Sequence, residues 1–375
     1  MTHKRIFIFF LLILSPLLMT GCWDQRIYEN VGFILQVGIE SGDNGELIIS
    51  YTSPVTDQKK TEQVELISIN SDSLREFREK TRLVSPKQLQ GGKTQQVVFS
   101  EELASKGILN LLEVFERDAE NPSQAYVVIS ESCPRGLFDY MQKLGDKPRP
   151  SFYLDSLIEG NHKSAYTPNT TVYNFTVDYF APGIDPIVPT IAKEIQSGKG
   201  IKVTGCALFS KDKMVGKINP KQTSLILAMK RDFISTEYIF KSLGPPSGDK
   251  TGKLGAAMLL KKLKRKIYIN IIDGIPVVNI SLNFSGNLDE YSWNHIDKKD
   301  VQTKYEKKMA SELEDECLRL LKYTQDVGSD PIGIGDMVRA KYNSYWKNID
   351  WNKMYKEVEF KVNAQINIEG YGVIR

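Results

Sequence analysis

The last third of the chain carries the pattern that most restricts its fold. Apolar and polar residues alternate on both sides of an Asp273-Gly274 turn, which predicts a β-hairpin over residues 267–284. Residues 301–324 instead place apolar side chains at helical spacing, and residues 358–368 alternate again without a break. This order predicts a C-terminal antiparallel sheet packed against a long amphipathic helix.

The preceding part of the chain alternates between strand and helix patterns. Over residues 62–145 this alternation predicts an α/β layer. Residues 151–195 are expected to hold one short helix, near 152–158, and otherwise irregular extended chain. Because domains commonly contain ~100–200 residues, 375 residues correspond to two or three of them. We therefore predict a multidomain α+β protein with two to three α/β-type domains.

Short segments rich in glycine and proline mark the expected domain boundaries. The sequence SGKG at 197–200 is the clearest, and GDKPRP at 145–150 suggests a weaker division near residue 148. The predicted organisation is an N-terminal domain over 22–199 and a C-terminal domain over 200–375.

The first residues have the layout of a secretory signal. Two basic residues, Lys4 and Arg5, precede an apolar run over 6–18, and Thr20-Gly21 leads directly to Cys22. The run is shorter than the ~20 residues that cross a bilayer, although a transmembrane anchor or a buried helix is the alternative. The residues before Cys22 resemble a bacterial lipobox. That resemblance implies that residues 1–21 are removed and that Cys22 becomes an N-palmitoyl, S-diacylglycerol cysteine, a lasting anchor because it carries more than one acyl chain.

Charge and cysteine content exclude two classes of protein. The chain has 49 Lys+Arg against 46 Asp+Glu, whereas nucleic-acid-binding proteins usually present a strongly basic face. Apart from Cys22, only Cys133, Cys206 and Cys317 are present, and an odd number of distant cysteines does not form a disulfide framework. We expect Cys206 and Cys317 to be small buried apolar residues.

Catalytic and ligand-binding patterns are weak throughout the chain. The sequence Gly92-Lys93-Thr94 lacks the first glycine of a phosphate-binding loop, and Gly333-Ile334-Gly335 fits a tight turn before a helix better than a dinucleotide site. Ser210 and Lys213 have the spacing of acyl-serine enzymes but fall in an expected hairpin loop. Beyond the signal, the histidines are His162 and His295, too far apart in sequence for a local metal motif. We predict no enzyme activity, no cofactor and no metal site.

Two surface candidates are left open. The basic run 261–266 can attract anionic headgroups or an acidic partner, or it can be a solvated helix end or strand entry, which we favour. Five aromatic residues near the C-terminus can form a partner contact or, as we favour, a wedge in the core. They are Tyr342, Tyr345, Trp346, Trp351 and Tyr355.

Four motifs, in order along the chain, resemble a known family. They are GCWDQR at 21–26, EELASKGI at 101–108, GCALFSKDKMVG at 205–216, and GSDPIGIG at 328–335 followed by Tyr345-Trp346. These segments are similar to the C-subunit (GerAC-like) lipoproteins of bacterial spore germinant receptors.

The resemblance implies a non-enzymatic subunit needed for nutrient-triggered spore germination. Such a subunit would be anchored through Cys22 on the outer face of the spore inner membrane, beside A-type and transporter-like B-type membrane subunits. Two alternatives are a lipid-tethered solute-binding protein of a transporter, which would need two similar lobes, and a surface hydrolase that uses His162 or His295.

Overall fold

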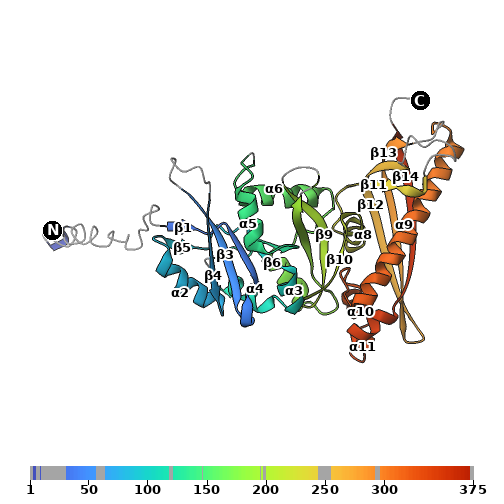
Figure 1. Ribbon diagram of the computed structural model, residues 1–375. Helices are drawn as coiled ribbons and strands as arrows, with labels where there is room; N and C mark the ends of the chain where they lie inside the picture. Colours follow the sequence, from blue (N-terminus) through green and yellow to red (C-terminus); the bar gives the residue numbers. More distant parts are fainter. Residues whose placement is uncertain are drawn as a thin grey trace.

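The computed structural model describes most of the chain after residue 30 (Figure 1). Cys22 and His295 lie outside the described residues. So do most residues of the expected signal and most of the segment 197–200. The described residues are 3–5, 9, 31–55, 64–117, 121–145, 147–194, 196, 200–243, 255–291 and 296–371.

An eight-stranded mixed sheet forms the body of the N-terminal half. Four adjacent strands in its middle run parallel, and the strands toward each edge pair antiparallel. In spatial order the strands are β10 (Lys213–Ile218), β9 (Gly200–Ser210), β8 (Ile187–Glu194), β7 (Tyr126–Ser130), β6 (Gln96–Ser100), β2 (Gln36–Ser41), β3 (Leu47–Pro54) and β4 (Val64–Ser71).

Helices cover both faces of this sheet, which explains why its central strands are apolar on both sides. In β6, Val97 and Phe99 face one core, whereas Val98 between them faces the other, and all three are fully buried. The first core is covered by α2 (Leu74–Val84), α3 (Glu101–Lys106), α4 (Leu109–Arg117) and α7 (Val172–Phe180), and the second by α5 (Pro134–Gln142) and α6 (Pro150–Lys163).

Within residues 151–195, the helix expected near 152–158 is confirmed as part of α6, but the expectation of irregular extended chain for the rest was wrong. The segment holds two helices, α6 and α7, followed by strand β8. The α7 sequence VYNFTVDYF is rich in β-branched and aromatic residues, which favour strands. The helix forms because Thr171 caps its N-terminus, accepting from the Asn174 amide, and because Val172 and Phe175 are fully buried against the sheet.

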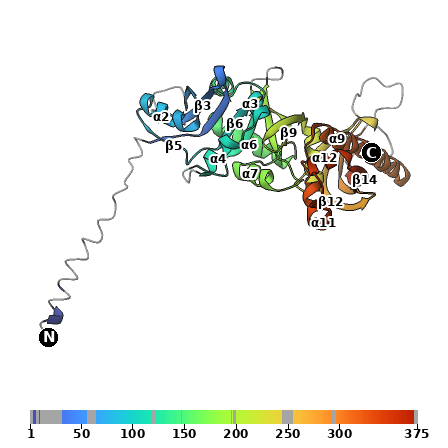
Figure 2. The same cartoon turned by 90° about the horizontal axis from the view of Figure 1, so that it is seen from below.

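A small parallel pair of strands extends the far end of this half. It consists of β1 (Val31–Phe33) and β5 (Gln88–Gln90), which lie beside α2 (Figure 1). This pair and α2 lie at the end of the molecule farthest from the C-terminal sheet (Figure 1, Figure 2).

The C-terminal half is a four-stranded sheet against one long helix, as predicted. The strands are β11 (Thr236–Phe240), β12 (Ala256–Ile272), β13 (Ile275–Tyr291) and β14 (Glu359–Tyr371), in that order, and the helix is α9 (Lys299–Val327). Asp273 and Gly274 both have positive φ, 49° and 81°, and join β12 to β13 in the predicted hairpin. The predicted helix stripe is buried: Tyr305, Met309, Leu313, Cys317, Leu320 and Leu321 are each at most 2% exposed.

The prediction that this sheet is antiparallel was wrong for its last strand. β14 pairs parallel with β13, so that Val277 lies opposite Glu359 and Leu288 opposite Tyr371. The reason is that α9 returns the chain along the sheet before β14 begins, and parallel neighbours require such a crossover. The sheet is therefore mixed.

The helix α8 (Pro220–Lys230) lies between the two sheets and connects their cores (Figure 1). A capping box formed by Asn219 and Gln222 starts it. Leu225 through Met229 are all buried, in one cluster that includes Cys206 of β9 and Phe284 of β13. The division of the chain near residue 199 stays a prediction, and the eight-stranded sheet continues across it through the β8–β9 pairing.

Candidate functional site

Of the residues singled out for catalysis that the structure describes, His162 lies in α6, whereas Ser210 and Lys213 lie in the β9–β10 hairpin. His162 ends α6, with Nδ1 3.2 Å from the Thr167 carbonyl oxygen. Ser210 and Lys213 pair across the turn between β9 and β10, as the hairpin prediction required. Within the described parts of the chain, no group of three or more His, Cys, Asp or Glu side chains is placed to hold a metal ion.

The basic run lies inside strand β12, not at a helix end or a strand entry. Lys262 and Lys264 point outward, and the Lys262 ammonium is 3.0 Å from the Glu369 carboxylate on β14. Because this pair is largely exposed, it contributes little to stability.

The aromatic cluster is part of the core, as the core interpretation held, although Tyr342, Tyr345 and Trp346 are half-buried and pack against its edge. Trp351 and Tyr355 are 8% and 2% exposed, and the Trp346 and Trp351 ring centroids lie 5.6 Å apart. The Tyr342 and Tyr345 hydroxyls donate to backbone carbonyls of the β12–β13 hairpin, at 2.9 and 2.7 Å. The cluster therefore holds the end of the chain against that hairpin.

Beside this cluster, a buried carboxylate holds together the loop between α9 and α10 (Ile334–Lys341). Asp330 is 2% exposed and follows Gly328, which ends α9 in the left-handed conformation. One of its oxygens accepts from the amides of Gly333 and Ile334, and the other from Gly335 and the Trp351 indole, all at 2.8–3.1 Å. Four N–H donors thus saturate one carboxylate.

A second carboxylate links this loop to the N-terminal half. Asp185, in the loop after α7, accepts from the Asp330 amide and the Lys211 amide, both at 2.8 Å. Nearby, Gly183 accepts from the Asp336 amide at 3.0 Å. We call Gly183, Asp185, Asp330 and Gly335 the aspartate joint.

The joint is packed too tightly for side chains at its glycines. A Cβ on Gly183, whose φ is 82°, would lie 2.4 Å from the Gly335 carbonyl carbon. A Cβ on Gly335 would lie 2.4 Å from the Trp351 indole nitrogen. Glycine is required at both positions because backbone meets backbone or ring there.

The electrostatics of the joint are set by its burial. Removal from water, and more weakly the neighbouring Asp185 carboxylate, raise the pKa of Asp330 to about 7 against the lowering effect of its N–H donors. Burial also raises the pKa of Asp185. Because the buried Asp330 carboxylate is saturated by N–H donors and its amide donates to Asp185, the joint can fix the orientation of the two halves.

Sequence analysis identified one side of this joint and missed the other. The predicted tight turn at Gly333–Gly335 is confirmed, since Gly333 has a φ of 79° and α10 begins after it. Asp185 was missed. Its signal is that Asp185-Pro186 repeats the Asp330-Pro331 dipeptide, and aspartate before proline favours a turn.

The cysteines behave as expected from their surroundings. Cys206 and Cys317 are fully buried, and burial raises the pKa of each thiol to about 12. Cys133, by contrast, is exposed at the start of α5. No described helix is both long enough and apolar enough to span a membrane.

Comparison with known proteins assigns this architecture to a family. The spore germination protein N-terminal domain model matches residues 24–193, and the spore germination B3/GerAC-like C-terminal model matches residues 204–372. The chain belongs to the GerAC-like family of germinant receptor C subunits.

Individual relatives of this family match over their whole length. Spore germination protein GerQC of Bacillus cereus is 24% identical over 375 residues, covering 99% of both chains. Spore germination protein B3 of Bacillus subtilis (strain 168) is 21% identical, covering 100% of this chain and 99% of its own. The crystal structure of the GerBC protein shares the fold, with a TM-score of 0.58 and 17% identity over 89% of this chain and 96% of that one.

Proposed function

We propose that this protein is a lipid-anchored subunit of a spore germinant receptor and is needed for nutrient-triggered germination. The observation that carries the proposal is that both halves of the GerAC-like family match in order along one chain. The proposal is also supported by the aspartate joint, whose buried hydrogen bonds link the two halves of one chain. A fixed relation between the halves suits a protein that presents surfaces to partners.

We further propose that Cys22 carries the anchor, as an N-palmitoyl, S-diacylglycerol cysteine on the outer face of the spore inner membrane. Eight residues, 23–30, separate Cys22 from the start of β1 at Val31. Fully extended, that link spans at most about 30 Å. The end of the body that carries β1, β5 and α2 would therefore stay close to the bilayer.

The proposed partners are an A-type subunit and a transporter-like B-type membrane subunit. The competing solute-binding function requires two similar lobes, whereas the two sheets here differ in strand number and order. Co-purification from spore membranes, followed by identification of the retained proteins, tests the assembly. Recovery of this chain without any receptor subunit would contradict it.

A Cys22→Ala variant tests the anchor. We expect it to leave the membrane fraction or to reduce nutrient germination, because one thioether-linked and one amide-linked lipid are lost together. Cys133→Ala is the matched control, since it removes an exposed thiol far from the motif. Unchanged germination together with unchanged membrane retention in Cys22→Ala would refute the proposal, and both readouts are needed because partners can retain an unanchored chain.

A further inference from the structure

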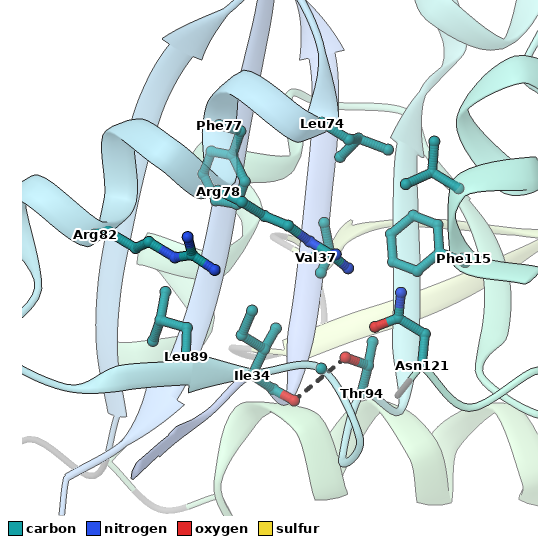
Figure 3. A pocket seen from close by; sticks show the side chains of 12 residues that line it. Ile34, Val37, Leu74, Phe77, Arg78, Arg82, Leu89, Thr94, Phe115 and Asn121 are labelled. Atoms are coloured by element: carbon teal, nitrogen blue, oxygen red, sulfur yellow. Dashed lines mark hydrogen bonds between the residues drawn. The ribbon is translucent and has the colours of Figure 1, made fainter. Parts of the chain in front are cut away.

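A cavity of about 110 Å³ lies beneath α2, next to the β1–β5 pair (Figure 3). Its inner surface is apolar and is made by residues from the sheet and from helices α2 and α4. The apolar lining residues are Ile34, Val37, Leu74, Phe77, Leu89, Val114 and Phe115. Four of these, Val37, Leu74, Phe77 and Phe115, are less than a tenth exposed.

The opening of this cavity is positively charged. Arg78 and Arg82 are exposed and lie one helical turn apart on α2, so their side chains share a face. Figure 3 shows both guanidinium groups extending across the cavity, Arg82 toward Leu89 and Arg78 toward Val37. None of the described lining residues is acidic.

A neutral hydrogen-bond donor adds to this charge. Asn121 lines the cavity, and its amide Nδ2 is buried with no hydrogen-bond partner in the described structure. Its amide oxygen fills the space where a Cβ on Gly91 would lie. A buried N–H without an acceptor is costly, so an unpaired donor at a cavity indicates an acceptor that is supplied from outside.

We propose that this cavity binds a small organic anion, with its carboxylate on Arg82 and Asn121 and a short apolar group inside. Arginine suits this role because its planar fork matches a carboxylate. Because a cavity of ~150 Å³ accepts benzene, a volume of about 110 Å³ limits the enclosed apolar group to a branched aliphatic group or to most of a phenyl ring. This site goes beyond the receptor-subunit function and does not depend on it.

Calorimetric titration of the full-length chain, purified in a non-ionic detergent, tests the site. The probes are benzoate and isovalerate, with inorganic phosphate and benzylamine for comparison. Benzoate is expected to bind with a Kd of about 0.1–3 mM, as is usual for so small a ligand. Benzylamine has the same ring with the opposite charge, and phosphate has charge without an apolar group, so each is expected to bind at least about 10-fold more weakly.

Three variants separate this site from general attraction of anions. Arg82→Gln should weaken benzoate binding at least about 10-fold, because a charged hydrogen-bonding partner is lost. Arg75→Gln is the matched control, since Arg75 lies on the same helix but outside the cavity, and it should change the Kd less than about 2-fold. Val114→Phe fills the cavity without changing charge and should abolish binding.

Several results would overturn the proposal. One is that benzoate shows no binding at about 10 mM. Another is that phosphate or benzylamine binds as tightly as benzoate. A third is that Arg82→Gln and Arg75→Gln weaken benzoate binding equally. Because Arg82 is exposed, its replacement should leave the thermal unfolding midpoint unchanged, which keeps the binding result interpretable.

Discussion

Replacing Asp330 with alanine should weaken the joint between the two halves by an amount that depends on pH. The substitution leaves four buried N–H groups without an acceptor, at about 1–3 kcal/mol each, or about 8 kcal/mol in total. It also relieves the burial of a carboxylate. With a folded-state pKa of about 7 against 3.8, that relief is worth about 4 kcal/mol at pH 7. The net loss of unfolding free energy at pH 7 is therefore about 4 kcal/mol.

The pH dependence has a definite sign. The folded state holds the Asp330 proton more tightly than the unfolded state, so wild-type stability falls as pH rises from about 4 to about 7. At pH 5 the relief in Asp330→Ala is only about 2 kcal/mol, and the net loss grows to about 6 kcal/mol. The gap between variant and wild type should therefore narrow by about 2 kcal/mol between pH 5 and pH 7.

Urea unfolding followed by tryptophan fluorescence measures this directly, because Trp351 donates to Asp330. Asp336→Asn is the matched control. Its carboxylate is 46% exposed and pairs with Arg339 on the same helix, so its loss should cost less than about 1 kcal/mol. An Asp330→Ala protein as stable as wild type would refute this account of the joint. So would a difference in unfolding free energy between variant and wild type that grows from pH 5 to pH 7.

Two further predictions follow from burial and backbone geometry. In the native chain a maleimide should label Cys133 within minutes and leave Cys206 and Cys317 unlabelled until denaturant is added. Mass spectrometry measures the labelling of each cysteine. Rapid labelling of Cys206 in the native chain would contradict its burial. Gly183→Ala should lower the free energy of unfolding by at least about 2 kcal/mol in thermal or urea melts, because the added Cβ would meet backbone atoms. Gly45 has a similar φ but open space around it, so Gly45→Ala should lower the free energy of unfolding by about 1 kcal/mol. Equal losses in the two variants would show that the positive φ, and not the close packing at Gly183, sets the loss of stability.

Local periodicity predicted the elements of the C-terminal half well. The hairpin at Asp273-Gly274 and the helix α9, which ends at the left-handed Gly328, combine a regular pattern with a turn or cap, and the last strand has unbroken alternation alone. The direction of β14 could not be predicted in this way, because alternation is the same in parallel and antiparallel strands. That direction is set by the path of α9 over the sheet.

Long-range pairing limited the prediction of the N-terminal half and of the site. The strand and helix patterns over residues 62–145 indicated an α/β layer but not that β2 lies between β3 and β6. The joint depends on Asp185 and Asp330, which are 145 positions apart in sequence and meet only in the folded chain. The cavity under α2 was missed for the same reason, since its arginines and its apolar lining come from separate segments.

The pairing of β8 with β9 also limits where the N-terminal and C-terminal segments of two family members can be joined in a chimaeric protein. The second family model begins at residue 204, within β9, yet β9 and β10 complete a sheet whose other strands all precede residue 199. A fragment that stops before β9 would expose β8 as an edge strand and remove Ala207 and Phe209 from the core they share with Val188. In a chimaera of two family members joined between β8 and β9, strand β8 of one parent must therefore pair with strand β9 of the other.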